Sequence, residues 1–179
     1  MIPHPGEYGA NAFWTTMAIK TTEGGIEKWI HLAEATGLGR ETIIECSGIL
    51  PGVRYAVDAY IALIRDHSLV VAVASSLTEL FSRDLISLRM DRLRRHYPFL
   101  IPGLDYFEGR LTQAPNDATF ALECVATHAT TREQREQVIY ALERKCDILW
   151  AQLDAIYCAY VQPRNIPPGC FTPQEQSRP

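Results

Sequence analysis

The fold is decided by residues 116–162, which read NDATFALECVATHATTREQREQVIYALERKCDILWAQLDAIYCAYVQ and contain neither glycine nor proline. Residues 53–97 also lack both, so more than half of the 179-residue chain is free of helix-breaking residues. Uninterrupted stretches of this length favour helix, and neither stretch alternates apolar and polar residues in the manner of a strand. The two stretches therefore predict an all-α protein, folded as a helical bundle.

Caps and breakers predict where the individual helices begin and end. Gly37 can close the first helix as a C-terminal cap, whereas Pro115 ends one helix and Asn116 or Asp117 caps the next. Thr130-Thr131 followed by Glu133 resembles a capping box that opens the longest helix. The run at 69–82 is apolar nearly all round, which is typical of a central buried helix. The expected helices span 26–36, 40–46, 53–65, 69–82, 85–96, 103–113, about 116–128 and about 131–161.

Composition and charge exclude several classes of protein. With 47% apolar residues, the chain can form a single domain with a substantial core. Its net charge of −4 lacks the basic excess that nucleic acids or an anionic membrane would favour, so we expect neither as a partner. The longest apolar run, Leu69–Ala74, is far shorter than the ~20 residues of a membrane span. Met1–Glu7 contains no readable secretory signal, so the expected location is the cytoplasm.

The cysteines and histidines do not form a metal-binding pattern. The five cysteines are widely spaced and form no C-x-x-C motif, so we expect reduced thiols rather than disulfides or a zinc site. The five histidines are scattered and form no H-x-x-x-H or Glu-x-x-His pair. We therefore expect no metal site.

Charged and polar residues lie on apolar helix faces in three of the expected helices. Helical spacing at 100° per residue places Lys145 at the edge of an apolar stripe on the last helix. The same spacing places Arg89 among leucine and isoleucine side chains, and Ser75, Ser76 and Glu79 along one line. The stripe on the last helix consists of Val138, Leu142, Cys146, Leu149, Leu153, Ile156 and Tyr160.

Two interpretations of these polar positions stay open. The long cationic side chains can extend along the core and hold their charges in water, or Glu79 can neutralise one of them. Alternatively, the polar positions line a cavity for an anionic ligand. Two buried unpaired cations would each cost several kcal/mol. Because one Glu79 cannot fully neutralise both Lys145 and Arg89, their coincidence favours the cavity.

A second polar face lies on the expected helix at 103–113. Tyr106, Arg110 and Gln113 share this face, opposite the apolar Leu104, Phe107 and Leu111. A polar helix face is normally just solvated. However, Tyr106 and Arg110 at spacing i, i+4 place a phenol beside a guanidinium, which can hold an oxyanion.

Several blocks in order along the chain resemble the pyrroloquinoline-quinone synthase (PqqC) family. The first blocks are GGIEKW at 24–29, LPGVRYAVDAY at 50–60 and SSLTELF at 75–81. Further along lie Tyr106-Phe107, RLTQA at 110–114, KCDILW at 145–150 and LDA at 153–155. The resemblance covers about 24–162. It implies a helical bundle of the haem-oxygenase type without haem, usually a homodimer.

The resemblance also implies an activity. Enzymes of the family complete pyrroloquinoline quinone by ring closure and oxidation of a polycarboxylated bicyclic precursor, using O2 and neither a metal nor an organic cofactor. Arg89 and Lys145 would bind carboxylates or quinone oxygens through charge-assisted bonds, while Tyr106 and Arg110 would act catalytically near the site of oxygen reduction. The other positions that match the family pocket are Tyr60, Ser76, Thr78 and Glu79.

The domain organisation expected from the resemblance has three parts. Residues 1–23 form an unmatched N-terminal segment, 24–162 the bundle and 163–179 a Pro-rich C-terminal tail. The family carries several helices with pocket histidines before the Gly24 block, so the sequence predicts an N-terminally shortened bundle. Asn11–Lys20 has enough apolar residues for one short helix.

Two alternatives to a synthase stay open. The chain can be a non-catalytic binding or scaffold protein that keeps the cationic half of the pocket. It can also be another member of the same superfamily, such as a thiamine-degrading or metal-oxidising enzyme, although the sequence offers no ligand spacing for iron.

Overall fold

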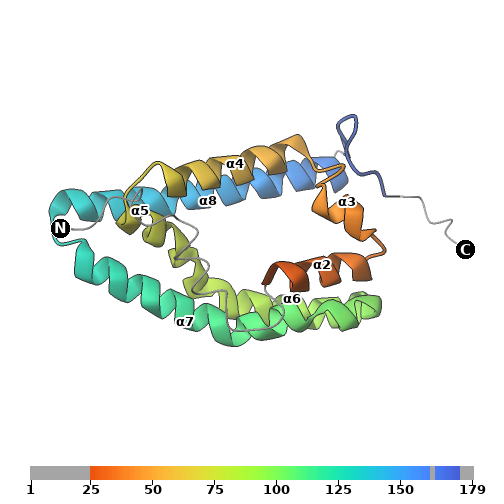
Figure 1. Cartoon of the computed structure of the whole chain (residues 1–179), viewed down its shortest axis with the longest axis horizontal. Helices are drawn as coiled ribbons and strands as arrows, with labels where there is room; N and C mark the ends of the chain where they lie inside the picture. Colours follow the sequence, from red (N-terminus) through yellow and green to blue (C-terminus); the bar gives the residue numbers. More distant parts are fainter. Residues whose placement is uncertain (1–24, 162–163, 174–179) are drawn as a thin grey trace, which may run out of the picture.

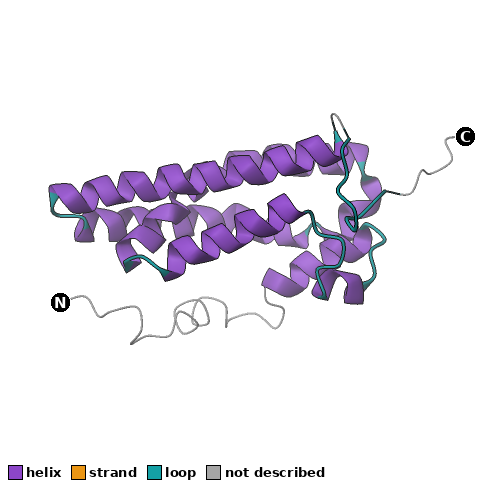
Figure 2. Cartoon of the chain, turned by 90° about the horizontal axis from the view of Figure 1, so that it is seen from above, coloured by secondary structure: helices purple, strands orange, loops and turns teal. Residues whose placement is uncertain are grey.

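The computed structural model describes residues 25–161 and 164–173. The helices of this part of the chain are joined by turns and loops, and it contains no strand (Figure 2). The all-α prediction is therefore confirmed. The segment 1–23, with its expected short helix at 11–20, lies outside the described residues. The helices are α2 (Gly25–Ala35), α3 (Arg40–Ile44), α4 (Pro51–Arg65), α5 (Leu69–Ala74), η1 (Ser75–Phe81), α6 (Ser82–His96), η2 (Pro98–Gly103), α7 (Asp105–His128) and α8 (Arg132–Tyr160), where η denotes a 3₁₀-helix.

The helices form two sides joined by a central connection. Figure 1 shows α4 lying along α8 on one side and α6 along α7 on the other. Between them, α5 and η1 contact both α7 and α8. Because η1 lies between α7 and α8, its polar side chains can reach both of these long helices.

The apolar core consists of two clusters. The larger cluster joins α4, α5, η1, α8 and the second half of α7, and the smaller joins α2, α6, η2 and the first turn of α7. The larger cluster includes Val71, Ala74, Ala121 and Ala141, and the smaller includes Leu32, Met90, Leu104 and Phe107. Since α7 contributes to both, it links the two clusters.

The composition of the run at 69–82 predicts a single α-helix, but the structure divides the run into two parts. Its α-helical part ends at Ala74, and Ser75–Phe81 continues as the 3₁₀-helix η1. The hydroxyls of Ser75 and Ser76 each donate to a carbonyl three residues back, at 2.7 Å. Such local bonds compete with the i to i−4 ladder of an α-helix and accompany the tighter winding. The predicted burial of the α5 part is confirmed.

The predicted break at Pro115 is wrong, because α7 runs through it without interruption. An internal proline loses one helical hydrogen bond and costs about 3 kcal/mol. Here the neighbouring Ala114 and Ala118 are buried, with exposures of 0% and 3%, and α7 packs against η1 at this level. An ion pair between Arg110 and Asp117 spans the proline. Packing and pairing together therefore keep the helix continuous.

The long helix α8 begins where the capping pattern predicts, but with a different partner. Thr131 is the N-cap, and the reciprocal bonds of the capping box involve Gln134 rather than Glu133. Gln134 lies three residues after the cap, at the position that can reach back to the backbone N–H of Thr131.

The apolar stripe predicted on α8 is wrong in its second half. Leu153 and Ile156 are exposed, whereas Ala141 and Ile148 are buried. Lys145 follows Ala141 by four residues and precedes Ile148 by three, so it lies on the same face as both, and it is half-buried. The buried row faces α4 and η1, the elements that α8 contacts most.

The described part of the C-terminal tail contains no helix, as its prolines predict, but it folds back onto the chain. The backbone N–H of Phe171 donates to the carbonyl of Gly48 at 2.8 Å, and the Tyr160 hydroxyl donates to the carbonyl of Phe171 at 3.0 Å. Gly48 has φ +75°, and a Cβ there would lie 3.0 Å from the Phe171 nitrogen. The turn before α4 therefore requires glycine at this position.

Candidate functional site

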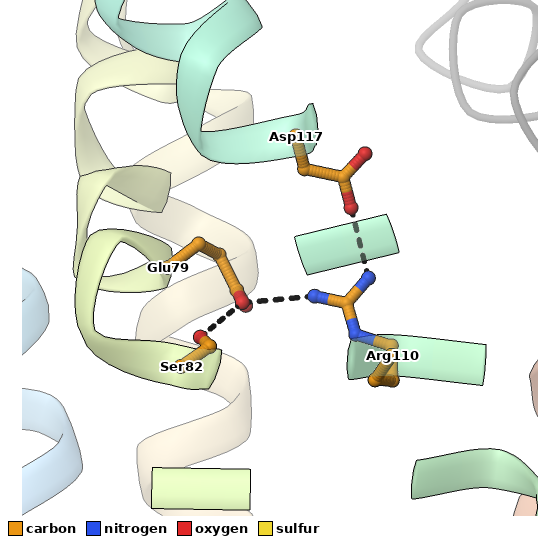
Figure 3. A network of polar contacts seen from close by, with 4 residues as sticks. All are labelled: Glu79, Ser82, Arg110 and Asp117. Atoms are coloured by element: carbon orange, nitrogen blue, oxygen red, sulfur yellow. Dashed lines mark hydrogen bonds and ion pairs between the residues drawn. The ribbon is translucent and has the colours of Figure 1, made fainter. Parts of the chain in front are cut away.

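A polar network connects η1, α6 and α7 where the two sides of the bundle meet (Figure 3). Arg110 Nη2 donates to Glu79 Oε2 at 2.8 Å, and Arg110 Nη1 donates to Asp117 Oδ2 at 2.8 Å. The Ser82 hydroxyl also donates to Glu79. The Arg110 side chain is only 18% exposed, so its ion pairs are partly shielded from water.

The local structure explains how these side chains meet. Arg110 and Asp117 are seven residues apart, which on a continuous α-helix places them two turns apart on one face. Glu79 projects from η1, which packs against α7. Ser82 is the first residue of α6, and its hydroxyl donates to Glu79.

The two carboxylates keep Arg110 charged. Burial lowers the pKa of Arg110, but the hydrogen bond to Asp117 and the charge of Glu79 outweigh it, so the pKa is raised. Tyr106 is near enough to contribute to this rise in pKa. Tyr106 and Arg110 lie four residues apart on α7, as predicted, but among the described residues no hydrogen bond joins the phenol to the guanidinium.

Lys145 lies next to this network, on α8. Its Nζ is 3.1 Å from the centroid of the Tyr60 ring on α4, a cation–π contact. Burial lowers the pKa of Lys145 to about 8, and the nearby charge of Glu79 offsets only part of that decrease. Burial likewise raises the pKa of the Tyr60 phenol, with a further contribution from Glu79. The structure thus brings Tyr60, Glu79, Arg110 and Lys145 into one cluster, which we call the junction cluster.

We expect Lys145→Met to raise the free energy of unfolding at pH 7. The folded-state pKa of about 8 lies below the ordinary value of 10.5, so protonation of Lys145 destabilises the folded state below pH 8. This penalty disappears as the pH rises from 8 toward 10.5. Allowing for the lost cation–π contact, the gain at pH 7 is about 1–2 kcal/mol.

Urea unfolding at pH 7 and pH 9.5 measures this effect. The gain should shrink at the higher pH, where the folded wild type carries a neutral Lys145. Lys28→Met, on α2, is the control and should change the free energy of unfolding by less than about 0.5 kcal/mol. A Lys145→Met protein that is less stable than the wild type at pH 7 would contradict the prediction.

Tyr106 belongs to an aromatic group on the side of the smaller core cluster. Its ring centroid lies 4.4 Å from that of Trp29 and 5.4 Å from that of Phe107. Trp29 comes from α2 and is 47% exposed. The phenol of Tyr106 is therefore held between α2 and the Arg110 face of α7.

The remaining predicted site residues do not belong to the junction cluster. Arg89 is exposed rather than enclosed by apolar neighbours, because its face of α6 points to the surface. Its guanidinium lies 5.8 Å from the Phe107 ring centroid, and it lines a surface hollow with Leu85, Leu88, Arg92, Leu93 and Tyr97. The hydroxyl of Ser76 is used on the carbonyl of Val73, and Thr78 is half-buried on η1.

Sequence reasoning missed the roles of Asp117 and Ser82, and the partner of Ser75. From the sequence, Asp117 is interpreted only as a helix cap, because Pro115 suggests a break. Its spacing of seven residues from Arg110 is the signal that could identify it as a partner of Arg110 on a continuous helix. Ser82 lies just ahead of the helix expected at 85–96, and no motif marks it as a partner of Glu79. Ser75 is completely buried and its hydroxyl lies 3.5 Å from the Tyr60 hydroxyl.

Within residues 25–161 and 164–173, no group of three His, Cys, Asp or Glu side chains is placed to hold a metal ion. The same residues include no helix that is long and apolar enough to cross a membrane.

Comparison with known proteins identifies the family. The model of the TENA/THI-4/PQQC family matches residues 10–155. The chain belongs to the TENA/THI-4/PQQC family. Its helices accordingly form the haem-oxygenase-like fold of this family, as the resemblance implies. The match extends ahead of Gly24, into residues that the structure does not describe.

Several curated relatives within this family are similar over most of the chain. The pyrroloquinoline-quinone synthase of Xanthomonas campestris pv. campestris (strain B100) is 48% identical over 158 residues, which are 88% of this chain and 63% of the relative. That of Acidiphilium cryptum is 53% identical over 83% of this chain and 61% of the relative. A bifunctional coenzyme PQQ synthesis protein C/D of Methylorubrum extorquens is 48% identical over 86% of this chain and 41% of the relative. The chain thus spans about three fifths of the synthases it matches.

Proposed function

We propose that this chain is a pyrroloquinoline-quinone synthase, or the part of one that carries the junction cluster. Relatives with that name share about half of their aligned residues with it. The reaction would be ring closure and O2-dependent oxidation of a polycarboxylated bicyclic precursor, without a metal or an organic cofactor. The substrates are therefore the precursor and O2.

Lys145 is the observation that carries the proposal. Among the described residues, no carboxylate pairs with it at salt-bridge distance, whereas Arg110 has two such partners. Burial lowers its pKa, so the folded protein keeps this cation at the expense of stability. A destabilising, unpaired ammonium is typical of a ligand-binding position. Its natural counterpart is a carboxylate or quinone oxygen of the substrate.

The other site residues have roles that follow from their positions. Arg110 would stabilise negative charge on reduced oxygen, and Tyr106 would donate or accept a hydrogen bond beside it. Glu79 supplies a negative charge near Lys145, and the Tyr60 ring contacts its ammonium. Arg89, with Ser76 and Thr78, would complete substrate binding from α6 and η1.

Precursor turnover tests the proposal directly. Purified protein, supplied with the precursor in air, should consume O2 and form the quinone chromophore. Protein that neither turns over the precursor nor binds the quinone would refute the proposal. Binding of the quinone without turnover, weakened by Lys145→Met, would instead support a non-catalytic binding protein.

We also propose that the protein acts in the cytoplasm. All five cysteines are free, which suits a reducing compartment.

We further propose a homodimer that covers the exposed apolar side chains of the second half of α8. Trp150 and Leu153 are 72% and 64% exposed, and large apolar exposed patches mark interaction surfaces. In a symmetric dimer each residue of the interface is buried twice. Leu153→Glu should therefore raise the dimer dissociation constant about 100-fold or more.

Sedimentation equilibrium measures this change. Ile101→Glu replaces a comparably accessible residue, 53% exposed, on η2, which packs against α2 and α6, and should leave the dissociation constant unchanged. A wild type that is monomeric at high concentration would contradict the dimer.

A further inference from the structure

Arg110 is held by two carboxylates that approach different nitrogens of its guanidinium. Figure 3 shows Glu79 approaching the group from η1 and Asp117 approaching it from α7. Each carboxylate accepts one hydrogen bond of 2.8 Å from Arg110. We propose that Asp117 is a positioning residue, which orients Arg110 for the reaction without touching the substrate. The inference rests on the proposed function, since it deepens the role of Arg110 in that site.

The geometry explains why a second carboxylate matters. A guanidinium is a rigid, planar fork with five N–H donors. One hydrogen bond, to Glu79, leaves this plane free to turn about the bond. A second bond, to the other terminal nitrogen, fixes the plane, and with it the direction of the remaining N–H donors. Oxyanion stabilisation depends on such donors being oriented before the charge develops.

The two carboxylates have separate tasks. Glu79 also accepts from Ser82, and its charge affects the pKa values of Lys145 and Tyr60. Asp117, in the part of the chain that the structure describes, is bonded through its side chain to Arg110. Substitution of Asp117 therefore perturbs the orientation of Arg110 and leaves the rest of the junction cluster in place.

A purely structural role of Asp117 predicts different behaviour. The Arg110–Asp117 pair spans Pro115, which lacks the N–H that would bond to the carbonyl of Leu111. The pair could serve only to hold α7 together at this point. In that case Pro115→Ala, which restores the helical hydrogen bond, would make Asp117 dispensable. If Asp117 positions Arg110, adding Pro115→Ala to the Asp117→Ala variant would restore stability but not activity.

Kinetics of Asp117→Ala, Asp117→Asn and Pro115→Ala/Asp117→Ala separate the two roles. We expect Asp117→Ala to lower kcat about 10- to 100-fold, as small misplacements of a reacting group do, with KM changed less than about threefold. Asn keeps an acceptor oxygen and should recover most of kcat. The double variant should regain the wild-type Tm and keep the low kcat. Glu123→Ala, the loss of an exposed acid on the same helix, should be neutral.

Recovery of kcat in the double variant, or wild-type kinetics of Asp117→Ala, would overturn the proposal. If the wild type itself shows neither turnover nor quinone binding, the proposed function fails and the NMR signals of Arg110 decide the positioning role. Its Nη protons, assigned through Arg110→Lys, should be resolved in the wild type and in Asp117→Asn. They should merge through rotation in Asp117→Ala, whereas identical signals in all three proteins would refute the role.

Discussion

Arg110→Ala is expected to lower kcat/KM for precursor oxidation by about 10²–10³-fold, the usual effect of removing one donor that stabilises a developing oxyanion. Arg110 is the cation of the junction cluster whose direction is fixed by bonds to two carboxylates. Its removal also leaves Glu79 and Asp117 without their counterion, so the site becomes repulsive to a polycarboxylate. Steady-state O2 consumption and quinone titration measure the two consequences.

Arg110→Lys serves as the second variant of this experiment. Lysine keeps the positive charge but cannot bond to both carboxylates as a fork, so it should regain quinone affinity and little of kcat. Arg132→Ala is the control, because the Arg132 side chain is 92% exposed. Wild-type kcat/KM in Arg110→Ala, with the protein shown to be folded by circular dichroism, would exclude the catalytic role.

Gly103→Ala is expected to destabilise the fold by about 3 kcal/mol or more, at the upper end of overpacking effects. A Cβ at Gly103 would lie 2.7 Å from Cα and 3.2 Å from the backbone nitrogen of Leu32. These are backbone atoms of α2, which cannot move without separating α2 from η2. The smaller core cluster would therefore lose its close packing. Thermal and urea unfolding measure the change.

Gly109→Ala is the matched control, six residues further along the chain. A Cβ there meets only the terminal nitrogen of Lys28, at 3.9 Å, and Gly109 lies within α7. Alanine should stabilise this helix position by about 0.5–1 kcal/mol. Equal effects of the two substitutions would show that the contact between η2 and α2 is not tight.

Glycine and proline placement predicts most helices of this chain, because those residues interrupt hydrogen-bond ladders locally. It fails at Pro115, where tertiary packing outweighs the local cost. It also fails at Ser75, where side-chain bonds to the backbone tighten the helix. Both failures concern free energies of a few kcal/mol, which local sequence cannot decide against long-range contacts.

Helical spacing identifies the junction cluster only in part. It marks Lys145 and Glu79 as charges on apolar faces and Arg110 as a charge on a polar face, and the family resemblance adds Tyr60. Arg89 is exposed although the same spacing places it among apolar side chains. Spacing alone cannot tell which face of α6 meets a neighbouring helix. The partners of Arg110 could not be assigned before its helix was known to continue beyond Pro115.

The division of the core into two clusters has a consequence for cooperativity. Each cluster can lose its packing as a separate unit, so native-state hydrogen exchange is expected to report two opening free energies. The Arg110–Glu79 pair lies at the boundary, between the α7 residues that serve the two clusters. A ligand held there contacts both units at once, and its binding energy is lost when either one opens. Substrate binding would therefore make the two units unfold as one.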